Sequence, residues 1–540
     1  MKIKRIGVAA IALAAAGALT LSGCTSGGAS PSADTGASTA VITTNGSEPQ
    51  NPLVPTNTNE VGGGKILDSI FAGLIFYDAK GAPVNDMAES IESDDAQNYT
   101  IKIKADQTFT NGEPVTANSF VDAWNYGAAL DNEQLSSYFF ESIEGFSYDE
   151  NVAELPGLEV VDDLTFTVAL KQPESDFPLR LGYSAFYPLP ASAFDDIEAF
   201  GENPVGNGPY MLDGEGAWKH NEKIDLVVNP DYQGPRQPAN GGLDIIFYAT
   251  QEASYADLQG GNVDVVDQIP SGALGTYQDE FPDHSVNQAA AIFQSFTIPA
   301  RLPHFSGEEG ALRRAAISKA INREEVTDVI FSGTRTPAHD FTSPVIDGYS
   351  EDIPGSDVLD FDADAAKDLW AQADAIAPWD GTFQIAYNAD GGHQAWVDAV
   401  ANQLKNNLGI DASGAPYPTF AEARTAITDR TIQTAFRTGW QADYPALFNF
   451  LGPIYGTGAG SNDGDYSNPE FDALLKEGLA ETDLDAANAK FQEAQEILFK
   501  DLPVIPLWYA TVNGAWSESV DNVEFGWNSV PLYYQVTKSE

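Results

Sequence analysis

Two hydrophobic patterns alternate along this chain. Strict alternation of apolar and polar positions predicts half-buried strands at residues 99–104 and 164–170. Apolar positions three or four residues apart predict helices over residues 62–77, from Thr116 past Trp124, and over 313–331, 363–377, 394–408 and 484–498. Short apolar runs predict further strands at residues 224–229, 243–248, 263–266, 383–388 and 504–512. Because helices and strands alternate through both halves, we predict α/β lobes, which usually bind ligands in the cleft between them.

Glycine, proline and asparagine mark several boundaries of these elements. A turn is expected at residues 108–114, which have Asn-Gly at their centre, and Asn468-Pro469 has the cap and first-turn proline that open a helix. Residues 203–210 contain two glycines and two prolines, so their backbone is strongly constrained. We find no internal repeat at a solenoid period.

Length and charge narrow the class of protein. A chain of 540 residues with 43% hydrophobic residues can form two or three domains with full cores. The formal net charge of −52 repels phosphate backbones, so nucleic acid is a poor partner. The simplest interpretation of this charge is a solvated surface that keeps an exported protein soluble.

The N-terminus has the pattern of an export signal. A basic start is followed by a short apolar run at residues 6–21, and Leu21-Ser22-Gly23-Cys24 resembles a bacterial lipobox. Because Cys24 is the only cysteine of the sequence, we predict a lipoprotein signal peptide at residues 1–23, lipidation of Cys24 and a flexible tether at 24–40. The folded part then lies outside the cytoplasmic membrane, on a Gram-positive surface or facing a periplasm.

Motifs for catalysis or metal binding are not apparent. The five histidines stand apart and form no zinc pattern, and there is neither a GxSxG elbow nor a P-loop. Asp463 and Asp465 resemble part of a calcium loop, but the spacing that follows does not continue the pattern. We therefore predict no metal, no cofactor and no enzyme activity.

One short stretch combines a carboxylate with aromatic rings. Residues 439–445 contain Trp440, Asp443 and Tyr444 and stop at Pro445. A carboxylate beside indole and phenol faces suits a cationic or zwitterionic ligand. On composition alone, turn chemistry before the proline and a tryptophan in the core explain the stretch better.

A series of segments nevertheless has a familiar order, at residues 81–117, 203–210, 258–264, 312–325 and 439–451. These segments resemble, in the right order, those of a known family, the solute-binding proteins of peptide/nickel (oligopeptide-binding) ABC importers. The chain departs from the family's usual residues at Ile91, Asn111 and Asn322. The resemblance runs from about residue 45 to the end of the chain.

This resemblance implies an α/β, two-lobed, periplasmic-binding-protein-like fold of the large three-domain class that closes on its ligand. The first lobe is expected to be discontinuous, with an extra α+β domain inserted and a hinge near residues 289–291 and 509–511. The implied division is residues 41–72, 187–288 and 510–540 for lobe I, 73–186 for the extra domain and 289–509 for lobe II.

The resemblance also implies a ligand site. By similarity, Asp443 pairs with the α-ammonium of a peptide, Trp440 walls a side-chain pocket and Tyr509 lines the pocket. Arg437 matches a position that meets a ligand carboxylate, and His393 matches a pocket histidine. A surface ion pair for Arg437 and a helix N-terminal position for His393 are the structural alternatives. Residues 59–61 are expected to offer backbone groups to an extended ligand.

The function implied is that of a lipid-anchored receptor that captures oligopeptides and delivers them to an ABC permease, and we expect a monomer. Members of the same family bind nickel chelates, haem and oligosaccharides, so a different ligand on the same fold is the alternative. A buried Asp443 argues against a neutral sugar, which offers no countercharge. A secreted hydrolase is the remaining alternative, although the sequence shows no catalytic residues for it.

Overall fold

The computed structural model describes residues 39–418 and 420–539, which form a mixed α/β structure. The predicted signal peptide, Cys24 and nearly all of the tether lie outside these residues. None of the described helices is both long and apolar enough to cross a bilayer.

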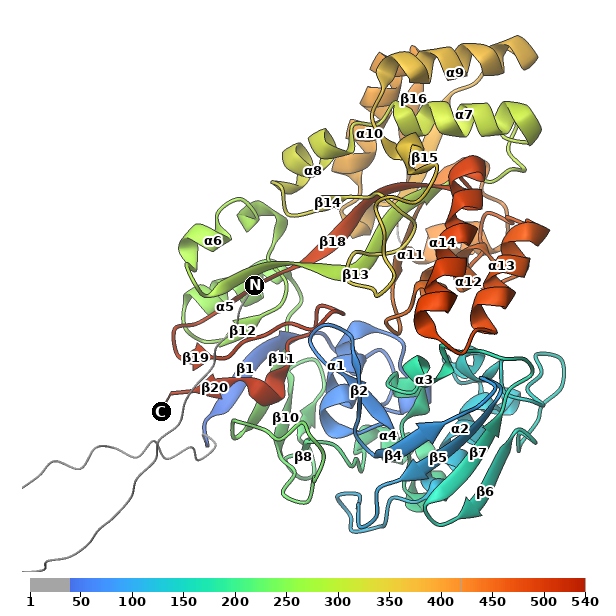
Figure 1. Ribbon diagram of the computed structural model, residues 1–540. Helices are drawn as coiled ribbons and strands as arrows, with labels where there is room; N and C mark the ends of the chain where they lie inside the picture. Colours follow the sequence, from blue (N-terminus) through green and yellow to red (C-terminus); the bar gives the residue numbers. More distant parts are fainter. Residues whose placement is uncertain (1–38, 419, 540) are drawn as a thin grey trace, which may run out of the picture. The chain divides into compact units, whose positions relative to one another are not determined.

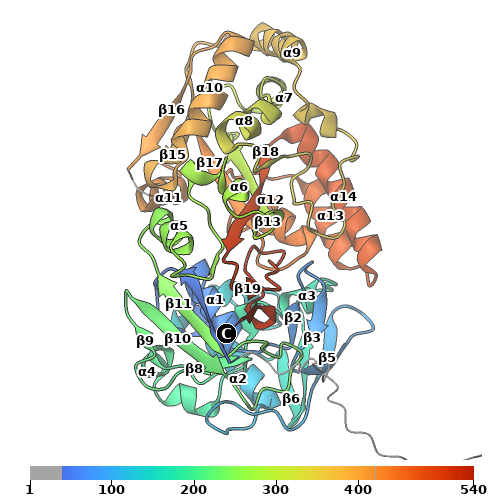
Figure 2. The same ribbon diagram turned by 90° about the vertical axis from the view of Figure 1, so that its left-hand side faces the viewer.

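One sheet of twelve strands runs through this part of the chain. Its central pair is β13 (Ser285–Thr297) and β18 (Val504–Trp516), two long antiparallel strands that lie side by side in Figures 1 and 2. Their register shifts between Ala289 and Phe293, next to the predicted hinge. On one side follow β17 (Ala435–Gln441), β15 (Phe383–Asn388) and β16 (Ala412–Tyr417). On the other side follow β12 (Val265–Val266), β1 (Val41–Gly46), β11 (Gly242–Phe247), β10 (Lys223–Val228) and β8 (Tyr210–Leu212).

A second, antiparallel sheet forms within residues 73–186. Its strands are β4 (Ala88–Glu92), β5 (Asn98–Ile103), β7 (Thr165–Ala169) and β6 (Leu158–Asp162), and α2 (Ala117–Ala128) packs against it. The predicted strands at 99–104 and 164–170 are thus confirmed, because alternate residues of β5 and β7 are buried. Trp124 of α2 meets Phe166 of β7 edge to face at 5.4 Å.

Helices surround the strands of residues 300–500. They are α7 (Gly307–Lys319), α8 (Arg323–Phe331), α9 (Ala363–Ile376), α10 (Gln394–Leu408), α11 (Phe420–Thr428), α12 (Leu447–Tyr455), α13 (Pro469–Leu479) and α14 (Leu484–Asp501). The predictions for residues 363–377, 394–408 and 484–498 are confirmed. Asn468 caps α13 as expected, since its side chain accepts a hydrogen bond from Glu470 N at 3.0 Å.

The predicted helix over residues 62–77 is too long. The helix α1 spans Val61–Ile70, and the chain then continues into β2 (Ile75–Tyr77), which pairs with β3 (Pro83–Asn85). The backbone after Ile70 binds the constrained segment 203–210 instead of continuing the helix. Asn207 exchanges two hydrogen bonds of 3.0 Å with Ala72, and Gly208 N donates to Ile70 O at 2.8 Å.

The predicted helix over residues 313–331 is wrong as one element. The structure divides it into α7 and α8, because the Asn322 side chain accepts a hydrogen bond from Glu325 N at 3.0 Å and caps α8. The asparagine that departs from the family's usual residue therefore still serves as a helix cap.

Two large hydrophobic clusters make up the core. The first draws on residues 42–245, Val265 and 512–536, and the second on residues 291–509 and Trp527. The stretch 439–445 lies where they meet, because Tyr444 belongs to the first cluster whereas Ala442 belongs to the second. This position brings the candidate ligand residues next to both cores.

Candidate functional site

The stretch 439–445 leaves the sheet at the end of β17 and is held by one side chain of α12. Asn449 Oδ1 accepts hydrogen bonds from Asp443 N at 2.9 Å and from Trp440 Nε1 at 3.1 Å. Asn449 Nδ2 donates to Asp443 Oδ2 at 3.1 Å. A single buried amide therefore fixes both the indole and the carboxylate of the motif.

Asp443 lies in the wall of a cavity of about 320 Å³. Burial raises the pKa of its carboxyl to about 6, although the Asn449 hydrogen bond acts in the opposite direction. No lysine or arginine forms an ion pair with Asp443 in the described part of the chain. A half-buried carboxylate without countercharge is costly, and an incoming cation would relieve that cost.

Eight aromatic residues of the described chain line the rest of the cavity wall. Besides Asp443, the motif contributes only Gln441 and Ala442, and the other lining residues come from 58–78, 182–187, 209–236 and 526–534. The aromatic members are Phe76, Tyr77, Tyr183, Tyr187, Tyr210, Trp527, Tyr533 and Tyr534. Such rings offer stacking and cation–π surface to a ligand.

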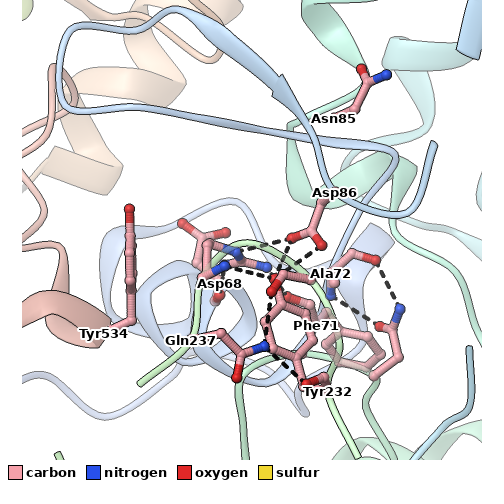
Figure 3. Close-up of polar contacts among 12 residues, drawn as sticks. Asp68, Phe71, Ala72, Asn85, Asp86, Tyr232, Gln237 and Tyr534 are labelled. Atoms are coloured by element: carbon pink, nitrogen blue, oxygen red, sulfur yellow. Dashed lines mark hydrogen bonds and ion pairs between the residues drawn. The ribbon is translucent and has the colours of Figure 1, made fainter. Parts of the chain in front are cut away.

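Both cations of the wall are paired with carboxylates outside it. Lys65 forms a buried ion pair with Asp267. Arg236 Nε lies 3.1 Å from Asp86 Oδ2, and its other nitrogens donate to Asp68 O at 2.6 Å and Phe71 O at 2.8 Å. Figure 3 shows these contacts around Asp86, with Tyr534 standing apart from them on the side of Asp68. The wall therefore has no cation left for Asp443.

The remaining carboxylates of the wall are Glu60, Asp68 and Asp78. Glu60 caps α1 by accepting hydrogen bonds from Gly62 N at 2.6 Å and Gly63 N at 2.8 Å. Asp78 accepts from two backbone N–H groups of its own turn. Asp68 accepts a hydrogen bond from the hydroxyl of Tyr187 at 2.8 Å and from no other donor among the described residues.

The other sequence-predicted site residues do not line this cavity. Tyr509 is fully buried in the second cluster, where its hydroxyl donates to Asp340 Oδ1 at 2.9 Å. Arg437 lies on β17, with Nη2 3.5 Å from Gln294 Oε1 and its buried Nε without a hydrogen bond. Desolvation lowers the pKa of this guanidinium.

His393 immediately precedes α10, and Trp396 Nε1 donates to its Nδ1 at 3.2 Å. Trp440 is half-buried beside Asp443 through Asn449 but is not part of the cavity wall. Of the five predicted ligand residues, Asp443 alone faces the cavity, while the predicted backbone segment 59–61 also lines it.

Asp463 and Asp465, which resemble a calcium loop, bind arginines. Asp463 accepts two hydrogen bonds from Arg424, at 2.5 and 3.0 Å, and Asp465 pairs with Arg430 at 2.8 Å and with Arg301 at 2.9 Å. Among the residues that the structure describes, no group of His, Cys, Asp and Glu could hold a metal ion.

The fold and site define a solute-binding protein. The chain belongs to family 5 of the bacterial extracellular solute-binding proteins, whose middle-region model matches residues 82–462. It is 24% identical over 489 residues to the oligopeptide-binding protein OppA of Bacillus subtilis, covering 87% of this chain and 88% of that protein. The family consists of solute-binding proteins and not of enzymes, as predicted.

Solved structures share the fold. The ABC transporter substrate-binding protein CtaP of Listeria monocytogenes superposes with a TM-score of 0.79 and 19% identity, covering 93% of this chain and all (100%) of that chain. OppA of Haemophilus influenzae in complex with the peptide RPPGFSPFR gives a TM-score of 0.73 and 22% identity, covering 93% and 99%. The predicted α/β, periplasmic-binding-protein-like fold is thereby confirmed.

Proposed function

We propose that this protein captures oligopeptides in the cavity at Asp443 and delivers them to the permease of an ABC importer. The observation that carries the proposal is a half-buried carboxylate, in an aromatic cavity, with no cation of its own. The α-ammonium of a peptide would supply the missing positive charge and donate hydrogen bonds to Asp443. The peptide-binding relatives support this ligand class.

The rest of the peptide would extend from this anchor. Backbone groups of residues 59–61, on the same cavity wall, suit the main chain of an extended ligand. The role of Arg437 toward a ligand carboxylate stays a prediction, which its unbonded Nε supports. The pocket roles of Trp440, Tyr509 and His393 also stay predictions, and for Tyr509 the buried hydroxyl on Asp340 favours a structural role.

Closure of two lobes about the hinge would enclose the ligand. In the predicted division, residues 73–186 are the extra domain and residues 289–509 are lobe II, and they are in contact in this structure. Tyr444 OH donates to Asp176 Oδ2 at 3.0 Å, and Ser175 N donates to Leu479 O at 2.8 Å. Ligand binding would then shift the population toward such a closed state.

The cellular setting is part of the same proposal. A monomeric receptor anchored through lipid on Cys24 would hold its folded part at the outer face of the cell membrane, close to the permease. Replacement of Cys24 by Ser should release the protein from the membrane fraction, and a membrane-bound variant would contradict the anchor.

The decisive experiment identifies the ligand. Residues 26–540 are purified and denatured, and the released small molecules are identified by mass spectrometry. Short peptides that are lost from Asp443→Ala would support both ligand and anchor. Glycans, or peptides that remain equally bound to Asp443→Ala, would contradict the site, and turnover of peptide or glycoside substrates would indicate the hydrolase alternative.

A further inference from the structure

The cavity wall contains carboxylates that neither cap a helix nor stabilise a turn. Its charged side chains are Glu60, Lys65, Asp68, Asp78, Arg236 and Asp443. The two cations are paired with Asp267 and Asp86, which are buried outside the wall. Two of the four carboxylates, Glu60 and Asp78, accept hydrogen bonds from backbone N–H groups. Asp68 and Asp443 remain without a backbone donor to either carboxylate oxygen in the described chain.

Asp68 lies in the last turn of α1, where its carboxylate serves no cap or turn. Its Oδ1 accepts from the hydroxyl of Tyr187, and its Oδ2 has no hydrogen-bond partner among the described residues. Arg236 is close, but its Nη1 binds the backbone oxygen of Asp68 and its Nε binds Asp86. One oxygen of Asp68 is thus free for a donor that enters the cavity.

Asp68 and Asp443 act on the same aromatic residues. Tyr77 and Tyr183 line the cavity with both of them. Burial, above all, and then the charges of both carboxylates raise the pKa of each tyrosine. Tyr77 packs edge to face on Trp527 at 5.4 Å, and Trp527 also lines the cavity. The two carboxylates therefore share one aromatic compartment, which suits a ligand with two positive groups.

We propose that Asp68 is a specificity residue that selects peptides beginning with lysine or arginine, by pairing with that side chain while Asp443 pairs with the α-ammonium. The inference rests on the proposed peptide-binding function. A first residue of this type carries both positive charges within one residue, which fits a cavity of about 320 Å³. The aromatic walls accommodate its aliphatic stem.

The test is a competition among peptides. Purified protein, freed of ligand, is incubated with an equimolar pool of peptides of three to nine residues whose first residue is Lys, Arg, Gln or norleucine. The bound peptides are released by denaturation and quantified by mass spectrometry. Asp68→Asn keeps an acceptor for Tyr187 and removes the charge. We expect the ratio of basic-first to neutral-first peptides to fall about tenfold in this variant, while neutral-first peptides bind as before.

A control variant separates the explanations. Asp78→Asn removes an equal charge from the same wall, at a turn position that asparagine also suits, and should leave the ratio unchanged. A ratio that is equal in the wild type and Asp68→Asn, or that falls as much in Asp78→Asn, would overturn the role of Asp68 while peptide binding stands. Capture of no peptide of the pool by the wild type would overturn the proposed function and this inference with it.

Discussion

The raised pKa of Asp443 predicts that peptide affinity depends on pH, if peptides bind at Asp443 as proposed. Only the ionised carboxylate attracts an ammonium group, and burial raises the pKa of the Asp443 carboxyl in the ligand-free protein to about 6. The ionised fraction is then about 90% at pH ~7 and about 10% at pH ~5. If binding requires this form, the association constant should fall about ninefold over that interval, which corresponds to roughly 1.3 kcal/mol. The direction is a loss of affinity as the pH falls.

Isothermal titration calorimetry can measure both the affinity and the protons. The ligand used is a peptide whose first side chain is neutral, so that Asp68 forms no ion pair with that side chain. At about pH 6 the free carboxyl is half protonated, so binding should release about half a proton, seen as a dependence of the heat on the buffer's ionisation enthalpy. Asp443→Asn, which can still accept a hydrogen bond from Asn449 Nδ2, should bind more weakly and lose both effects.

The reasoning would be refuted by two results. One is an affinity that is the same at both pH values, with no proton released. The other is an equal pH dependence in the wild type and in Asp443→Asn, which would assign the titration to another group. Asp68 is the main alternative, because burial raises the pKa of its carboxyl as well and it lines the same cavity. Burial also raises the pKa of Asp340 to about 6, but Asp340 is fully buried with Tyr509 and does not line the cavity.

Three further predictions concern stability and closure. Above about pH 6, Asp443→Asn should raise the free energy of unfolding of the ligand-free protein by about 1–3 kcal/mol, because the ionised Asp443 carboxylate destabilises the folded state. The gain should vanish below the unfolded-state pKa of about 3.8, where the carboxyl is protonated in both states. Urea unfolding above about pH 6 and below about pH 3.8 measures the difference. Tyr444→Phe removes the hydrogen bond to Asp176 and should weaken ligand affinity about three- to tenfold through a faster off-rate, which stopped-flow displacement detects; an unchanged off-rate would contradict a role in closure. Gly206→Ala would put a methyl group 1.9 Å from a backbone oxygen and should cost more than about 2 kcal/mol or prevent folding, whereas Gly272→Ala, in open space, should leave the melting temperature nearly unchanged.

Local patterns predicted the secondary structure well because local forces determine it. Thr116 precedes α2 and its backbone N–H donates to Ser119 Oγ at 3.1 Å, as in a capping box, so the start of α2 was readable from the sequence. The failures came from distant contacts. The end of α1 at Ile70 depends on Asn207, and no hydrophobic spacing reports that contact. Asn322 was the exception, since Asn-Arg-Glu-Glu is a recognisable helix start that the apolar spacing obscured.

The candidate site was only partly predictable for the same reason. Asp443 could be found because a carboxylate between two aromatic residues forms a compact motif. Asp68 lies hundreds of residues before Asp443 and Trp527 lies fewer than a hundred after it, both in segments without a motif, and only the fold brings them to one cavity. The resemblance to the family predicted that Tyr509 and Arg437 lie near the ligand, but it carried no information on which way their side chains point.

The side chains of the neighbouring residues Asp443 and Tyr444 point in different directions and contact different parts of the protein. Asp443 faces the cavity, whereas Tyr444 is buried in the first cluster and donates to Asp176. Asp176 is itself paired with Arg180, 2.7 Å away, whose guanidinium lies over the Tyr444 ring at 5.7 Å. A peptide ammonium that fixes Asp443 would also fix the backbone of Tyr444, and so favour the contact between residues 73–186 and residues 289–509. If the contact is populated more with ligand bound than without it, weakening the contact lowers the ligand affinity, by at most the free energy of the contact, which is why affinity is the appropriate measurement for Tyr444→Phe.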